Sequence, residues 1–178
     1  LALAKEHHSV WLGNTTVGAG LPINYAISDL LNSGDEIHEI AGIFSGTLSW
    51  LFQKYDAQIP FSVLMKDALA QGLTEPDPRE DLSGRDVQRK LLILARAAGF
   101  KLQLADIDVQ SLVPESLRDL DKEHFLSQSS QLDEYFLTQF TQAKQNDHCI
   151  RYVARFSAKS GKLKAKVSLE QLPENDAF

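Results

Sequence analysis

Four ionisable side chains stand close together in the middle of the chain: Glu75, Asp81, Asp86 and Lys90. Three carboxylates and one ammonium group in so short a stretch suit an amino-acid-like ligand, because the ligand's own ammonium is attracted to carboxylates. A lysine that is partly shielded from water and paired with carboxylates has a tunable pKa and can give a proton to a reacting oxygen. These four residues are therefore the candidate site of catalysis and ligand binding.

Two sequence elements must hold these side chains in place. Pro76 and Pro78 fix their own backbone and favour extended conformations in the residues before them, which predicts a stiff loop. A helix predicted over residues 85–98 follows, and it carries Asp86 and Lys90 four residues apart on one face. The helical projection puts Lys90 beside the buried apolar stripe. The face toward solvent carries the three arginines of the helix, Arg85, Arg89 and Arg96.

Two other interpretations of the cluster stay open at this point. Asp86 and Lys90 could form an ordinary surface salt bridge beside solvated acidic residues, in a non-catalytic amino-acid-binding or dimerisation module. Lys90 could also form a Schiff base with an aldehyde. A variant without Lys90 separates the first alternative from catalysis, and borohydride trapping tests the second.

The hydrophobic pattern predicts an α+β fold with helices packed on one face of a mixed β-sheet. The helix of residues 85–98 should begin after an N-cap at Ser83, with Asp86 as capping-box partner, and end at Gly99. The other predicted helices cover residues 2–6, 23–32, 48–55, 61–71 and 123–145. The predicted strands cover residues 9–13, 37–44, 106–112, 149–158 and 162–169, the last two joined by a turn at Ser160 and Gly161.

Composition excludes several classes of protein. The net charge of -6 is the wrong sign for a nucleic-acid groove, and no apolar run is long enough for a membrane span. The single cysteine, Cys149, cannot form an internal disulfide, which indicates a cytoplasmic protein, and we expect it to be a small buried apolar residue. The 5 histidines are scattered, so we assign none as a metal ligand.

The chain has no dinucleotide-binding fingerprint. Gly18 and Gly20 form a glycine turn, but Ile23 stands where the third glycine of G-x-G-x-x-G belongs. We therefore assign no cofactor-binding residue to this chain. Because it opens on Leu1 within a helix-like segment and stops at Phe178 without a terminal signal, we expect residues 1–178 to be a single substrate-binding and catalytic domain excised from a longer polypeptide.

Three segments resemble the signature of homoserine dehydrogenases, in the family's order and at a matching spacing. They are residues 16–22 (TVGAGLP), 42–49 (GIFSGTLS) and 74–90 (TEPDPREDLSGRDVQRK). The likeness extends over nearly the whole chain. Asn14 together with residues 43–52 is similar to the dehydrogenase half of the bifunctional aspartokinase–homoserine dehydrogenases of the methionine branch.

This resemblance implies an activity and a set of roles. The activity is the interconversion of L-aspartate 4-semialdehyde and L-homoserine with NADP or NAD. The family binds this cofactor mainly through a Rossmann domain, which this chain lacks and which would precede Leu1. Lys90 would be the proton donor to the carbonyl oxygen, and Asp86 would hold and polarise the reacting end with it. Glu75 and Asp81 would bind the substrate, Glu75 at its ammonium. The fragment would fold but would not catalyse by itself.

The resemblance implies further contacts and partners. Gly46 and Thr47, at a strand-to-helix break, would contact the substrate, and a helix N-terminus there favours its carboxylate. The family is typically dimeric through its sheet, so a homodimer is expected. Backbone carbonyls would hold a monovalent cation, Na⁺ or K⁺, at Asn14, Val17, Ala19 and Leu21.

Three positions depart from the family pattern. Glu80 stands where the family often has Asp, and Leu73 stands where many members have Tyr. Asn14 replaces a common glutamate at the cation loop. A cation site built from backbone carbonyls tolerates this change, whereas a site that needs a carboxylate ligand does not.

Overall fold

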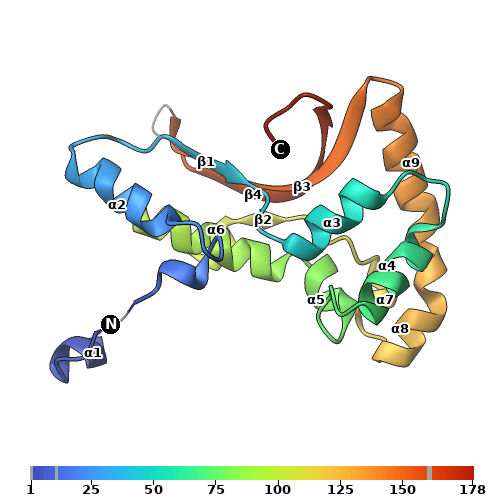
Figure 1. Ribbon diagram of the computed structural model, residues 1–178, viewed down its shortest axis with the longest axis horizontal. Helices are drawn as coiled ribbons and strands as arrows, with labels where there is room; N and C mark the ends of the chain where they lie inside the picture. Colours follow the sequence, from blue (N-terminus) through green and yellow to red (C-terminus); the bar gives the residue numbers. More distant parts are fainter. Residues whose placement is uncertain (1, 11, 160–161) are drawn as a thin grey trace.

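A computed structural model describes residues 2–10, 12–159 and 162–178 and shows an α+β fold (Figure 1). Within these residues, four strands form one sheet in the order β1-β3-β4-β2. The β1–β3 and β3–β4 pairs are antiparallel and the β2–β4 pair is parallel, so the sheet is mixed, as predicted. The strands are β1 (Glu39–Gly42), β2 (Asp108–Val109), β3 (His148–Ser157) and β4 (Lys164–Pro173).

A long hairpin of β3 and β4 is the centre of the sheet. Tyr152 lies opposite Leu169 in its register, and alternate β3 residues such as Ile150 and Phe156 are buried in the core. This alternation is what the period of two in a strand produces when one face packs against helices. The two predicted hairpin strands are confirmed, while the predicted turn at residues 160–161 lies outside the described residues.

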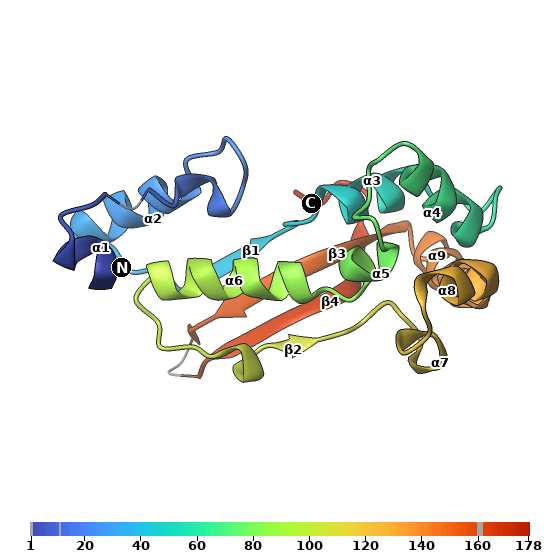
Figure 2. The same ribbon diagram turned by 90° about the horizontal axis from the view of Figure 1, so that it is seen from below.

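The longest helix, α6 (Arg85–Ala97), lies along one face of the sheet (Figure 2). Helices α3 and α9 also contact β3, and Figure 1 shows that they gather with α4, α5, α7 and α8 at one end of the sheet. The other helices and 3-10 turns are α1 (Ala2–Glu6), η1 (Asn14–Thr16), α2 (Ile23–Asn32), α3 (Gly46–Lys54), α4 (Phe61–Ala70), α5 (Pro78–Leu82), η2 (Leu104–Asp106), α7 (Glu115–Arg118), α8 (Lys122–Gln128), η3 (Ser129–Leu132) and α9 (Asp133–Lys144).

Two groups of buried apolar residues hold these elements together. The larger group includes Phe61 and Phe136, whose rings stack with centroids 3.7 Å apart and so join α4 to α9. The smaller group joins Val17 and Ile27 to Leu94 near the end of α6. The sheet and both groups therefore fix α6, which carries two of the candidate site residues.

Several predicted elements differ from the structure. Residues 9, 10, 12 and 13 form no strand, because Val10 and Leu12 are 81% and 80% exposed and have no neighbouring strand. The strand predicted over residues 106–112 is only two residues long, since 3-10 turn η2 precedes it and a bend follows. Cys149 is half-buried, not buried as predicted.

The junction between α5 and α6 also differs from the prediction. Ser83 is not the N-cap of α6, because that position belongs to Gly84, with φ +73°. The side chain of Asp86 is paired with Lys90 and does not complete a capping box. A Cβ on Gly84 would lie 2.0 Å from the Tyr152 hydroxyl oxygen, so both the backbone conformation and the lack of space require glycine.

Candidate active site

The segment of residues 72–84, which includes α5 and is called the acidic loop below, lines a cavity of about 250 Å³ together with the start of α6. Three of the predicted site residues, Glu75, Asp81 and Asp86, line this cavity together. Its remaining lining residues are Ser45, Glu80, Val87 and Arg89. The structure therefore brings the predicted carboxylates to one place, although they come from different parts of the loop and helix.

Lys90, the fourth predicted site residue, is not among the residues that line this cavity, but its ammonium is paired with Asp86, which does line it. The side chain of Lys90 is 26% exposed, and its Nζ forms an ion pair of 2.7 Å with Asp86 and donates a hydrogen bond of 3.0 Å to the Phe44 carbonyl oxygen. An ammonium has three N–H donors, so these two contacts leave one for a ligand. The position beside the buried stripe agrees with the helical projection.

The loop between β1 and α3 contributes Ser45 to the cavity lining, whereas the predicted contact residues Gly46 and Thr47 are not among the lining residues. Ser45 is the N-cap of α3 and accepts a hydrogen bond of 3.2 Å from the Leu48 amide. Gly46 and Thr47 are the first residues of α3, whose initial amides have no acceptor within the helix and form an anion-attracting end. The Thr47 hydroxyl donates to the Leu73 carbonyl oxygen at 2.7 Å and so joins α3 to the acidic loop.

Asp81 is the most enclosed carboxylate of the cluster. Its Oδ2 accepts a hydrogen bond of 2.8 Å from the Glu75 amide, which fixes the loop around it. Burial raises the pKa of Asp81 above its usual range, and the nearby Asp86 carboxylate adds to the rise, while the bonds from Glu75 and Thr47 oppose it. A positively charged ligand group beside Asp81 would lower this pKa again, so cation binding and ionisation of Asp81 support each other.

The family model for homoserine dehydrogenase matches residues 22–178. The chain belongs to the homoserine dehydrogenase family. It is 49% identical over 165 residues to the bifunctional aspartokinase/homoserine dehydrogenase 2 of Escherichia coli (strain K12), a match that covers 93% of the chain and 20% of that protein. It is 36% identical over 188 residues to the homoserine dehydrogenase of Emericella nidulans, covering 99% of the chain and 50% of that protein.

A solved homoserine dehydrogenase from Thiobacillus denitrificans has the same fold, with a TM-score of 0.77 at 22% identity. That match covers 99% of this chain and 36% of the other. The chain therefore spans between about a fifth and a half of the length of these homoserine dehydrogenase relatives. Among the described residues, no helix is long and apolar enough to span a membrane.

The predicted cation loop of this homoserine dehydrogenase domain lies between η1 and α2, apart from the cavity. Gly18 and Ala19 have φ values of +83° and +50°, which turn the backbone sharply there. Two carboxamide oxygens, Oδ1 of Asn14 and Oδ1 of Asn24, are buried without a hydrogen-bond partner among the described residues. Buried oxygens without donors are costly, and a monovalent cation with oxygen ligands would satisfy them, so these residues fit such an ion.

Three parts of the homoserine dehydrogenase cavity were not predicted from the sequence. Arg89 lines the cavity and is also exposed to solvent, as the helical projection predicted. Its spacing of three from Asp86 was the signal that could have identified it. Ser45 also lines the cavity, and the Phe44 carbonyl holds Lys90. A backbone carbonyl leaves no mark in the residue types, so this last contact could not be found by sequence reasoning.

Proposed function

We propose that this chain provides the substrate pocket and the proton donor of a homoserine dehydrogenase, within a longer protein that also binds the nucleotide. The reaction is L-aspartate 4-semialdehyde plus NAD(P)H and a proton, giving L-homoserine and NAD(P)⁺. One observation supports this proposal above the others. In a member of the homoserine dehydrogenase family, the ammonium of Lys90 is paired with Asp86, one of the three predicted carboxylates that line a single cavity.

The carboxylates have the position and charge to bind the amino-acid end of the substrate. We assign the substrate ammonium to Glu75 and Asp81, whose charges attract it and whose loop is held by the hydrogen bond between them. We assign the substrate carboxylate to the N-terminus of α3 at Gly46 and Thr47. With the ammonium and the carboxylate of the amino-acid end both held, the aldehyde at the other end has a defined direction. This reduces the entropy cost of reaction.

Lys90 then moves the proton. A nicotinamide cofactor held by another part of the protein would supply the hydride for this reduction. As negative charge develops on the aldehyde oxygen, the free N–H of Lys90 donates a hydrogen bond to it and passes its proton, giving the alcohol and a neutral amine. Asp86 and the Phe44 carbonyl hold the ammonium in place during this step. In the reverse direction, the neutral amine of Lys90 accepts the hydroxyl proton of homoserine.

The cofactor is assigned mainly to another part of the protein. A cavity of about 250 Å³ suits an amino-acid-sized substrate and is too small to enclose a dinucleotide as well. We propose NADP or NAD as this cofactor, and we expect the 178-residue chain alone to fold without catalysing. We further propose a homodimer and a cytoplasmic location, which rest on the family's sheet-mediated dimers and on the single cysteine.

Glu75 gives the test of substrate choice. In the full-length protein, Glu75→Gln should raise KM for aspartate semialdehyde by about 10–100-fold, because a charged hydrogen bond to the ammonium is weakened. Succinate semialdehyde lacks that ammonium, so the wild-type preference for aspartate semialdehyde over it should shrink by a similar factor. The measurement is NAD(P)H consumption with each aldehyde.

The matched control for Glu75→Gln is Glu36→Gln, an exposed glutamate in the loop after α2, which should leave both aldehydes unaffected. If Glu75→Gln leaves the preference for aspartate semialdehyde over succinate semialdehyde unchanged, Glu75 does not bind the substrate ammonium. A full-length wild type that neither reduces aspartate semialdehyde nor oxidises L-homoserine would overturn the proposed function.

We also propose a structural Na⁺ or K⁺ at the loop of Asn14, Val17, Ala19 and Leu21, with the buried Oδ1 of Asn24 beside it. Replacing both ions with choline at constant ionic strength should lower Tm by about 2–4 °C for an ion that contributes about 1 kcal/mol. Scanning calorimetry of wild type measures this shift.

Two asparagine variants complete the cation test. Asn24→Ala should abolish the ion dependence of Tm, because it removes one of the two unpartnered oxygens. Asn32→Ala, at the exposed end of α2, should keep it. Equal Tm values for wild type in choline and in alkali salts would exclude the cation.

A further inference from the structure

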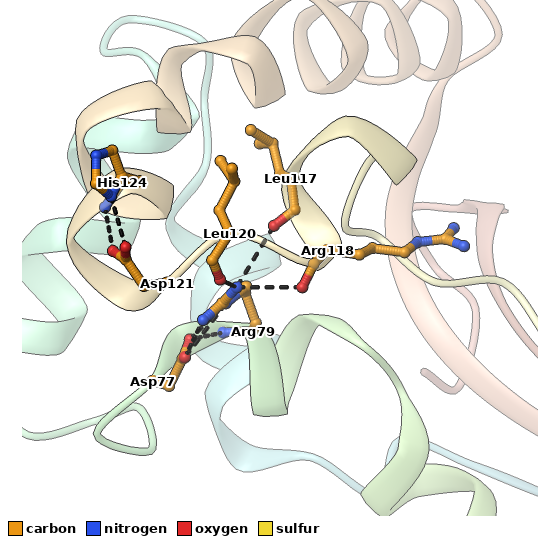
Figure 3. Close-up of polar contacts among 7 residues, drawn as sticks. All are labelled: Asp77, Arg79, Leu117, Arg118, Leu120, Asp121 and His124. Atoms are coloured by element: carbon orange, nitrogen blue, oxygen red, sulfur yellow. Dashed lines mark hydrogen bonds and ion pairs between the residues drawn. The ribbon is translucent and has the colours of Figure 1, made fainter.

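The guanidinium of Arg79 holds the short helix α5 against the end of α7 and the segment that follows it (Figure 3). We propose that Arg79 and Asp77 form a positioning pair that places the carboxylates of Glu75 and Asp81 for the substrate ammonium. This inference rests on the proposed function and deepens it, because neither residue of the pair lines the candidate active-site cavity.

Arg79 is joined to the end of α7 and to the segment that follows it through backbone carbonyls. Its Nη1 donates to the carbonyl oxygens of Leu117 at 3.5 Å and Arg118 at 3.2 Å, and also to that of Leu120. Its guanidinium lies 5.2 Å from the centre of the buried Phe125 ring. Helix α7 is four residues long, and its last carbonyls lack intrahelical donors, so a guanidinium with five N–H groups satisfies them.

Asp77 fixes the other side of the guanidinium. Nε of Arg79 donates to Asp77 Oδ1 at 3.0 Å and Nη2 pairs with Oδ2 at 2.6 Å, which is a two-pronged ion pair. Asp77 is also the N-cap of α5 and accepts from the Arg79 amide at 3.0 Å. The hydrogen bonds from Arg79 hold the pKa of Asp77 below its usual range. Both side chains are mostly shielded, at 17% and 28% exposure, so water competes weakly.

The carboxylates of the site depend on where α5 lies. Asp81 belongs to α5, and its carboxylate accepts a hydrogen bond from the amide of Glu75, which precedes α5 in the acidic loop. Only Pro78 and Leu82 of this five-residue helix are buried. Glu80 lines the active-site cavity on one side and a second cavity of about 420 Å³ on the other. With hollow space on both sides, packing fixes α5 incompletely, and the polar contacts of Arg79 supply the missing constraint.

Lys90 is positioned independently of this pair. Its ammonium is held by Asp86, on the same helix, and by the carbonyl of Phe44, on the β1–α3 loop. A disturbance at Arg79 should therefore weaken substrate binding and leave the proton-transfer step nearly unchanged. This division between KM and kcat distinguishes a positioning role from a purely structural one.

The test uses Arg79→Lys in the full-length protein, since lysine keeps the charge but cannot make the planar, two-pronged contacts. KM for aspartate semialdehyde should rise about 10-fold, with kcat within about 3-fold of wild type and KM for the nicotinamide cofactor unchanged. The matched control is Arg151→Lys, because Arg151 also donates to backbone carbonyls, those of Phe52 and Ile150, away from the cavity. The control should lower Tm and leave every KM unchanged.

Asp77→Asn serves as a second variant if Arg79→Lys does not fold. It removes the ion pair, keeps the contacts of Arg79 to the carbonyls, and should raise KM for the aldehyde by about 3-fold. A fall in Tm with an unchanged KM in the folded variant would overturn the positioning role. Lys90→Met, measured in parallel, separates the two proposals. If it loses kcat while Arg79→Lys leaves KM unchanged, only the positioning role fails; if it keeps kcat, the proposed function fails as well.

Discussion

Replacing Lys90 with methionine is expected to lower kcat of the full-length protein by about 10²–10⁴-fold, the usual contribution of a positioned proton donor. Methionine has a similar length and suits a side chain that is only 26% exposed at the edge of the core, so folding should be retained. The assay is NAD(P)H-dependent reduction of aspartate semialdehyde, with circular dichroism to confirm the fold.

Lys90→Arg separates proton donation from charge. Arginine keeps the positive charge beside Asp86 but hardly ever releases its proton, so it should lose nearly as much activity as methionine. Lys66→Met, an exposed lysine on α4, is the control and should be fully active. Folded Lys90 variants with wild-type kcat would favour the alternative, a non-catalytic binding or dimerisation module. A borohydride-trapped adduct at Lys90 would favour Schiff-base chemistry.

Replacing Gly84 with alanine is expected to destabilise the fold by about 2–5 kcal/mol, the largest effect on stability that the structure indicates for a single methyl group. Two costs combine. The φ of +73° is strained for any residue with a Cβ, and the new Cβ would lie 2.0 Å from the Tyr152 hydroxyl oxygen and 3.1 Å from a Val109 methyl carbon. Urea unfolding of the 178-residue chain measures the change.

Gly72→Ala is the matched control for Gly84→Ala. Gly72 has a similar φ of +71°, but nothing lies within 4 Å of its added Cβ, so only the backbone cost of about 1 kcal/mol applies. Tyr152→Phe removes the clashing hydroxyl, and Gly84→Ala should cost about 1 kcal/mol less in that background. If Gly84→Ala and Gly72→Ala lower the free energy of unfolding equally, the contact with Tyr152 does not contribute to the cost at position 84.

The parts of the site that the sequence predicted depend on short-range geometry. Asp86 and Lys90 were placed by helical spacing, and the structure pairs them at 2.7 Å. Glu75 and Asp81 were joined to them because two prolines restrict the segment, and all three carboxylates line one cavity. The predicted loop is wrong for residues 78–82, which form helix α5 because Asp77 caps it and Pro78 suits its first turn. The fold class and both hairpin strands were predicted for the same reason, since alternation and helical periodicity are local properties.

The parts that were not predicted depend on contacts between distant segments. Gly84, and not Ser83, caps α6, because the tight passage over Tyr152 requires a positive φ. The Phe44 carbonyl reaches Lys90 only because β1 lies beside β3 in the folded sheet. Val10 and Leu12 have a strand-like pattern but no partner strand, and burial decides whether such a pattern becomes a strand.

A crystal structure of the full-length protein with L-homoserine bound would test the central claim most directly. We predict that the homoserine hydroxyl oxygen lies within about 2.6–3.2 Å of Lys90 Nζ, as proton transfer requires, with the homoserine ammonium against Glu75 and Asp81. Homoserine bound outside this cavity, or a hydroxyl beyond hydrogen-bonding reach of Lys90, would contradict the assignment of Lys90 as the proton donor.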